Sequence, residues 1–170
     1  MAMEKLQALQ AEILAQEDPA LRKAQYLAMG DLLEETMVPE ICQFFLDRLA
    51  QETDKYVLDA MLLALSKLTI PPQVKLDALI ACTTHGELLV RRSAIYALRA
   101  SDTEASREVL RSWLRRKKEK VTRIEMTYVL AAMGSVGQAE DLPMLERYLQ
   151  WDTLDVRRAA QIAIDRIREK

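Results

Sequence analysis

The sequence predicts an all-α protein, a right-handed α-solenoid of about five helical hairpins in a single domain. One helix pattern occurs five times, and successive copies start 36, 33, 32 and 34 residues apart, which is the period of helical repeat arrays. An amphipathic segment precedes every copy, and the 170 residues include only 4 glycines and 5 prolines. Because one hairpin cannot bury its apolar face alone, we expect neighbouring hairpins to stack along the whole chain.

The repeated helix is defined by an anchor residue and by a core-type residue eight positions later. The anchors are Leu21, Val57, Val90, Thr122 and Val156, and the core-type residues are Met29, Leu65, Leu98, Leu130 and Ile164. An acidic residue lies three positions before four of the anchors, namely Asp18, Asp54, Glu87 and Glu119. Such a carboxylate can cap the first turn of a helix or interact with the helix dipole.

The helix that precedes each repeated helix has apolar residues at spacings of three, four and seven, the pattern of an amphipathic helix. We expect these helices to begin near Met3, Pro39, Pro72, Thr103 and Glu140. Proline is tolerated in the first turn of a helix, and the prolines that fit such starts are Pro39, Pro71, Pro72 and Pro143. The hairpins then occupy approximately residues 1–36, 37–69, 70–101, 102–135 and 136–170, and no strand is expected.

The composition gives no overall attraction to nucleic acid or to anionic membranes, because the formal net charge is −2. The charge is unevenly divided, with a net charge of −6 over residues 1–85 and +4 over residues 86–170. No apolar stretch approaches the roughly 20 residues needed to span a bilayer, and the N-terminus does not resemble a signal peptide. We therefore expect a cytoplasmic protein without membrane contact, either a monomer or a weak dimer.

The last hairpin carries a recognisable motif, with a proline in its first helix and Val156–Ala159 at the start of its second helix. Residues 137–160 resemble a HEAT repeat in the short bacterial form of the phycobilisome-lyase type, and residues 38–65 and 90–94 resemble it too. Residues 122–125 depart most from this pattern. The resemblance implies a protein-interaction scaffold or adaptor and, as an alternative, a bilin lyase-type or chaperone-like subunit.

Positions two, five, six and nine after each anchor point away from the core, because successive helical residues are 100° apart. The resemblance implies that these positions line the concave surface of the solenoid. Among their side chains are Tyr26, Tyr96, Tyr128, Leu62, Ile95 and Ile124. Tyrosines beside arginines are typical of protein-binding surfaces. We predict that the partner-binding residues are Arg92, Tyr96, Arg99, Tyr128 and Arg158. The alternative interpretation is that bulky residues at position six, such as Leu27, Leu63 and Ile162, pack between adjacent helices.

An arginine directly follows four of the five anchors, at Arg22, Arg91, Arg123 and Arg157. These arginines allow two interpretations. They either form a row that binds anions or pair with acidic side chains of neighbouring repeats. The resemblance implies the second arrangement, a ladder of ion pairs along the solenoid.

The densest run of positive charge lies in and after the first helix of the fourth hairpin. Its residues are Arg107, Arg111, Arg115, Arg116, Lys117, Lys118 and Lys120. The three residues Arg107, Arg111 and Arg115 are spaced by four and predict one exposed helical stripe. The basic segment 107–123 is either a phosphate-binding patch for nucleic acid or a solvated outer helix whose cations interact with the helix dipole.

No catalytic motif, cofactor site or metal site is predicted. His85 is the only histidine, and no glycine-rich phosphate loop is present. Cys42 and Cys82 differ by seven residues in their offset from the anchors, about 10 Å along a helix, so we expect reduced, buried thiols. Trp113 is expected in the core, whereas Trp151 either caps the last hairpin or contacts a partner. The predicted function is therefore non-catalytic protein binding.

Overall fold

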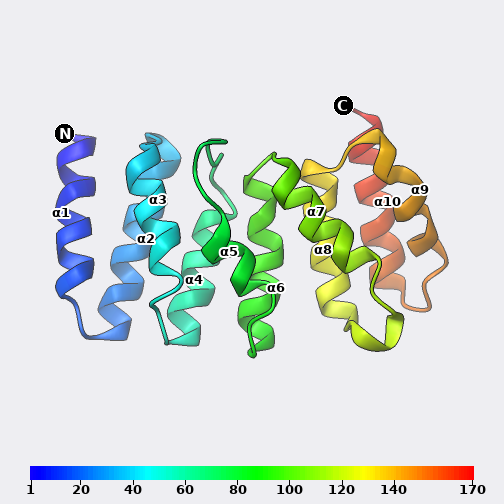
Figure 1. Ribbon diagram of the computed structural model, residues 1–170, viewed down its shortest axis with the longest axis horizontal. Coiled ribbons are helices and arrows are strands. Elements are labelled where there is room, and N and C mark those ends of the chain that lie inside the picture. The colour runs from blue at the N-terminus through cyan, green and yellow to red at the C-terminus, as the bar shows by residue number, and fades with distance from the viewer.

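The computed structural model describes all 170 residues and contains ten α-helices and no strand. Figure 1 shows the helices in a row that runs from α1 at the N-terminus to α10 at the C-terminus. The first helices of the five hairpins are α1 (Ala2–Ala15), α3 (Pro39–Arg48), α5 (Asp77–Cys82), α7 (Glu104–Leu114) and α9 (Leu142–Glu146). The second helices are α2 (Pro19–Glu35), α4 (Lys55–Leu65), α6 (Leu88–Ala97), α8 (Arg123–Val136) and α10 (Leu154–Arg168). The predicted all-α repeat solenoid is confirmed.

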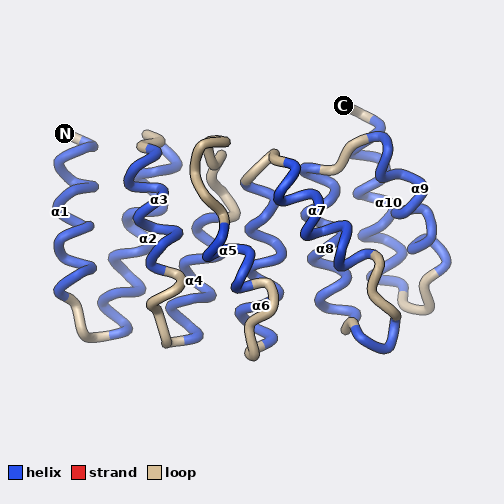
Figure 2. Tube along the Cα trace, in the orientation of Figure 1, coloured by secondary structure: helices blue, strands red, loops and turns tan.

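Four short 3-10 helices complete the structure. They are η1 (Leu98–Ala100), which extends α6, then η2 (Lys118–Lys120), η3 (Ala139–Asp141) and η4 (Arg147–Gln150). The loops gather at the two ends of the helices, so the long faces of the array are helical (Figure 2). None of the helices has both the length and the apolar character that crossing a bilayer requires.

The second helices form one continuous layer, in which α2, α4, α6, α8 and α10 each pack against the next. One cluster of 45 buried apolar residues runs from Leu6 to Ile167 and includes Trp113, as predicted. Glycine allows α2 and α4 to approach closely, because a Cβ atom at Gly30 would lie 2.9 Å from the Cβ of Ala64. The solenoid is therefore held together by a core shared between neighbouring repeats.

The starts of the second helices are capped, but only partly as predicted. Asp18 and Asp54 each accept hydrogen bonds from two amides of the following turn. Glu87 lies at the N-cap of α6 but its side chain makes no hydrogen bond to the helix, so of its two predicted roles the capping one is wrong. Glu119 lies within η2, and Thr122 caps α8 in its place.

The fourth hairpin has a different register from the predicted one. Thr122 is the N-cap of α8 and forms a reciprocal capping box with Glu125. The anchors of the other second helices lie three residues after the N-cap, and Glu125 is the residue at that position in α8. Thr122 is therefore not an anchor. A shift of three residues turns a helix by about 300°, so the predicted faces of α8 move by only about 60°.

The start of α5 also differs from the prediction. The helix begins at Asp77 rather than near Pro72, and the residues before it form a loop beside α3 (Figure 1). The side chain of Gln43 binds the backbone of this loop, accepting from Lys75 N at 2.7 Å and donating to Lys75 O at 3.3 Å. Ile70 N donates to Ala100 O at 2.8 Å. These contacts satisfy loop groups that a longer helix would have paired internally.

Candidate functional site

A groove crosses the second helices on the side that faces away from the first helices. It consists of two hollows of about 470 and 420 Å³ that share Tyr96, Thr127 and Ala131. We call it the second-helix groove. Its lining residues are Leu63 of α4, Tyr96 of α6, Thr127, Tyr128 and Ala131 of α8, and Asp155, Arg158, Ala159, Ile162 and Arg166 of α10.

Two tyrosines and two arginines are in contact on this face. The rings of Tyr96 and Tyr128 meet edge to face, with centroids 5.6 Å apart and an interplanar angle of 90°. The guanidinium of Arg99 lies 4.9 Å from the Tyr96 centroid and donates to its hydroxyl. The guanidinium of Arg92 lies 5.9 Å from the Tyr128 centroid. The structure thus brings together four of the five residues that the sequence predicted for partner binding.

Arg158, the fifth predicted residue, lies on the opposite wall of the same groove and lines one hollow together with Tyr96. Sequence reasoning missed Arg166, which lines the same hollow. The signal was present, because Arg158, Ile162 and Arg166 are spaced by four residues and therefore share one stripe of α10.

The position-six residues Leu27, Leu63 and Ile162 are 39%, 40% and 53% exposed. The interpretation that they pack between adjacent helices is therefore wrong. The residues that do so are one position earlier, at Tyr26, Leu62 and Ile95, and all three are fully buried. They belong to the hydrophobic core and not to a binding surface. Tyr26 packs edge to face on Phe45 with centroids 5.4 Å apart and accepts a hydrogen bond from Arg48.

The positive charge of the groove is largely uncompensated. Four arginines around it form no ion pair within the chain, namely Arg92, Arg99, Arg158 and Arg166. The Nε atom of Arg92 is buried without any hydrogen-bond partner. Asp155, the one acidic lining residue, lies 3.5 Å from Arg123. The groove therefore presents guanidinium groups beside aromatic and aliphatic side chains.

The ladder of ion pairs is confirmed for Arg22 and Arg91. Arg22 Nε donates to Glu52 at 2.9 Å, and Arg91 Nε donates to Glu125 at 2.9 Å, in each case across a repeat boundary. Arg123 also pairs with an acidic side chain of the next repeat, Asp155 at 3.5 Å, but the register of α8 places this pair in the exposed first turn. Arg157 donates to the carbonyl oxygen of Trp151 at 2.6 Å and forms no ion pair.

The two buried carboxylates of the ladder have lowered pKa values. Burial alone would raise the pKa of Glu52, but hydrogen bonds from Arg22 and from the amides of Asp54 and Thr53 outweigh it. Burial would likewise raise the pKa of Glu125, and bonds from Thr122 and Arg91 lower it. Both side chains are therefore held in the charged form.

The predicted basic stripe on α7 is wrong. Arg107 and Arg111 are only 9% and 8% exposed. Arg107 pairs with Asp102 at 2.6 Å, and Arg111 pairs with Asp141 at 2.7 Å. The hydrogen bond that Arg111 donates to Asp141 raises the pKa of Arg111 above its ordinary value. Arg111 ties α7 to the following hairpin, whereas Arg107 is paired within its own hairpin. Neither guanidinium group is therefore available to bind phosphate.

The remaining cations of this segment are partly engaged as well. Arg115 pairs with Glu108 at 2.8 Å, and the Arg116 guanidinium lies 3.5 Å from the centroid of the Trp113 ring. Lys118 pairs with Asp152 at 2.7 Å. The exposed cations without an ion pair are Lys117 and Lys120. Trp151 stacks on Tyr148 with centroids 5.0 Å apart, and Lys118 lies over its ring, so it closes the turn of the last hairpin.

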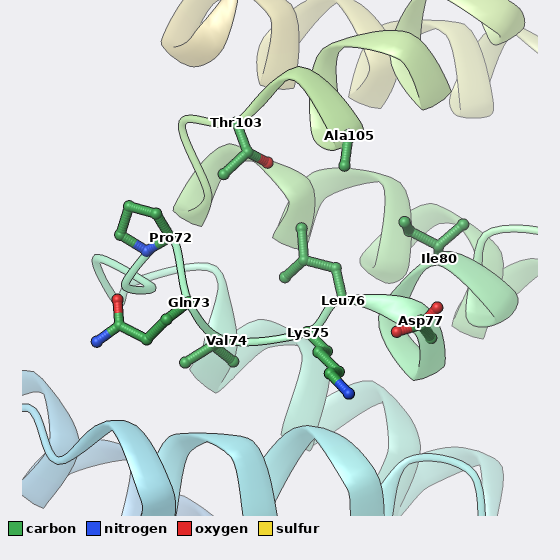
Figure 3. Close-up of a pocket in the computed structure, with 9 residues that line it drawn as sticks. All are labelled: Pro72, Gln73, Val74, Lys75, Leu76, Asp77, Ile80, Thr103 and Ala105. Atoms are coloured by element: carbon green, nitrogen blue, oxygen red, sulfur yellow. The ribbon is translucent and has the colours of Figure 1, made fainter.

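A separate hollow of about 270 Å³ lies where the expected first turns of α5 are replaced by a loop (Figure 3). Figure 3 shows Leu76 pointing toward Thr103 and Ala105, whereas the ammonium group of Lys75 points away from them. Residues 72–77 form most of its wall. No cluster of charged or nucleophilic groups converges on it, so the second-helix groove is the stronger candidate.

The two cysteines are buried and free. Burial raises the pKa of Cys42 to about 11 and that of Cys82 to about 11, so neither thiol is a reactive nucleophile at neutral pH. His85 lies in the turn before α6, where its Nδ1 accepts from the amide of Glu87 at 3.1 Å. No three His, Cys, Asp or Glu side chains gather in a way that holds a metal ion.

Comparison with known proteins gives one family. A family model described as HEAT repeats matches the sequence twice, over residues 42–131 and over residues 76–165. Taken together, the two matches span residues 42–165, well over half of the chain. No curated protein matches the sequence.

Proposed function

The chain belongs to the HEAT-repeat family, and on this premise we propose that it is a non-catalytic scaffold that binds a protein partner in the second-helix groove. HEAT repeats are commonly protein-interaction scaffolds. The fold also provides the means, since stacked repeats create one extended surface from residues far apart in the sequence.

The observation that carries the proposal is the Tyr96–Tyr128 pair, which lies between the guanidinium groups of Arg92 and Arg99. Exposed Leu63 and Ile162 lie on either side. Tyrosine and arginine are enriched among the residues that dominate the energy of protein interfaces. A surface with this composition in a hollow of several hundred Å³ is typical of a binding site and not of an ordinary solvated helix face.

The groove is supported by a rigid framework. The core continues without interruption beneath α4, α6, α8 and α10, and the Arg91–Glu125 pair links the third hairpin to the fourth. A preformed surface loses little conformational entropy on binding. The proposed mechanism is therefore docking of a partner onto a fixed array of side chains.

The test is site-specific photo-cross-linking in the source cells. A benzophenone amino acid replaces Thr127 in the groove or, as the matched control, exposed Ser112 on α7. We expect one protein to be cross-linked from position 127 and not from position 112, and the product to disappear when Tyr96→Ala is added. Equal products from both positions, or none from position 127, would refute the proposal.

The nucleic-acid alternative has less support. It depended on the basic segment 107–123, in which Arg107 and Arg111 are buried in ion pairs. Charge reversal of Arg115 and Lys117 tests it directly. If these changes abolish retention of nucleic acid in an electrophoretic shift at 0.1 M salt, this alternative replaces the groove proposal.

A further inference from the structure

We infer that the segment bound in the second-helix groove is an acidic amphipathic helix that lies across α4, α6, α8 and α10. This inference rests on the proposed function and adds the chemistry and the shape of the partner. Three features of the groove carry it, namely its charge, the spacing of its apolar side chains and the way in which its tyrosine rings are covered.

The charge of the groove selects carboxylates. Arg158 and Arg166 are exposed on α10 and form no ion pair, and Arg92 has a buried Nε atom without a partner. By contrast, Arg22 and Arg91 of the ladder are neutralised by the chain itself. Uncompensated guanidinium groups steer and orient a partner of opposite charge, and Arg binds carboxylates through paired hydrogen bonds.

The apolar side chains of the groove recur from one helix to the next at a distance close to two turns of an α-helix. Leu63, Tyr96, Ala131 and Ile162 each lie nine residues after the N-cap of their helix, one on each of four neighbouring helices. Packed helices are about 8–10 Å apart, and residues seven apart on a helix are about 10.5 Å apart. A helix that crosses the groove and has an apolar residue at every seventh position therefore presents one apolar side chain to each successive helix of the groove.

Ala131 provides the pocket for one of these side chains. It is the small member of the series, and both hollows include it. A leucine-sized group of the partner fits between Tyr96 and Ile162 at this point, because these two side chains are large and Ala131 between them is small. This is the helix-in-groove mode of recognition, in which anchors on one face enter successive pockets.

The tyrosines do not form a platform for nucleic-acid bases. Base stacking needs an open ring face, whereas Tyr96 and Tyr128 contact each other edge to face and have Arg99 and Arg92 over their rings. A protein helix does not need an open ring face, so it is compatible with this arrangement of the tyrosines.

The test uses a display library of 18-residue peptides with leucine at every seventh position and Glu, Gln or Lys at random on the flanking positions. It is selected on the wild-type protein, on Arg158→Glu/Arg166→Glu, and on Arg115→Glu/Lys117→Glu as the matched double charge reversal outside the groove. We expect at least fivefold enrichment of Glu over Lys on the wild type and on the control, and loss of this preference on the groove variant. Circular dichroism verifies that all three proteins are folded.

The selected peptide is then measured by fluorescence anisotropy. A proline at its centre should weaken binding at least tenfold, because the peptide can no longer form one helix. Unchanged affinity would overturn the inference that the bound segment is helical. Enrichment of Lys, or no groove-dependent enrichment at all, would overturn the inference, as would groove-dependent binding of a 20-nucleotide oligothymidylate. If a cellular protein is nevertheless cross-linked from position 127, the proposed function stands and only the acidic helix is rejected.

Discussion

Arg91 donates from Nε to Glu125 Oε1 at 2.9 Å and links the third hairpin to the fourth. The same arginine donates through its NH1 group to the carbonyl oxygens of His85 and Gly86, both at 2.8 Å. One side chain therefore holds both the loop before α6 and the first turn of α8, the second helix of the next hairpin. This arrangement couples the orientation of consecutive repeats to the loop geometry.

Removal of Glu125 should destabilise the protein strongly. Glu125→Ala leaves Arg91 with an uncompensated charge and also breaks the capping box with Thr122. We expect a loss of about 3 kcal/mol in the free energy of unfolding, measured by urea denaturation. The matched control is Arg123→Ala, whose exposed pair with Asp155 should contribute less than about 1 kcal/mol. Similar effects of the two changes would contradict the structural role of the ladder.

The ladder should also make stability depend on acid pH. The pKa values of Glu52 and Glu125 are both lowered from the ordinary value of 4.5 by folding. Their stabilisation is complete above the unfolded pKa and is lost as the pH falls through the lower folded values. The urea midpoint should therefore hold from pH 7 to about pH 5 and fall below about pH 4.5. Glu52→Gln/Glu125→Gln should differ from wild type at pH 7, and the difference should shrink as the pH falls below the ordinary glutamate pKa. A difference that does not change with pH would refute this explanation.

The close approach of α2 and α4 can be tested by a destabilising substitution in one helix and a compensating substitution in the other. A methyl group at Gly30 would lie 2.9 Å from the Cβ of Ala64, so Gly30→Ala should force the helices apart. We expect a net loss of about 1 kcal/mol, because overpacking outweighs the gain in helix propensity. Adding Ala64→Gly should restore most of the stability. Gly86→Ala, where a methyl group meets nothing within 4 Å, is the control in thermal denaturation.

The sequence predicted the fold because the apolar spacing of each helix depends only on local periodicity. It could not predict the register of α8, where Glu125 occupies a position that an apolar residue holds in the other repeats. A buried glutamate there is tolerated only because Arg91 comes from the preceding repeat. The late start of α5 has a similar cause, since Gln43 of another hairpin holds the loop.

The candidate site was predictable in part for the same reason. The spacing of helical residues placed Arg92, Tyr96 and Arg99 on one face, and the structure shows that they lie on it. Whether a bulky residue on that face is exposed depends on the distance to the neighbouring helix, which the sequence does not contain. Buried Tyr26 and exposed Leu27 are adjacent in the sequence and show how narrow this boundary is.

Because Arg111 is buried and Arg115 is exposed, their removal should affect the stability of the protein differently. Arg111→Ala leaves Asp141 and Glu140 without their partner and should cost about 3 kcal/mol in the free energy of unfolding. Arg115→Ala removes an exposed pair with Glu108 and should cost less than about 1 kcal/mol. Urea denaturation of the two variants at pH 7 measures this contrast. Small effects of both changes would indicate a solvated stripe instead of a buried network of ion pairs.

The groove itself can be closed without touching a charged or aromatic residue. Ala131 is half-buried at the point where the two hollows meet, so Ala131→Leu fills the space for the partner and leaves the Tyr96–Tyr128 pair in place. We expect binding of the partner cross-linked from position 127 to weaken at least tenfold, which corresponds to about 1.4 kcal/mol. Ser112→Leu, at an exposed position of α7, adds a similar apolar group outside the groove and should leave the affinity unchanged. Thermal denaturation of both variants separates loss of the groove from loss of the fold, and full binding by a folded Ala131→Leu protein would move the partner site away from α8.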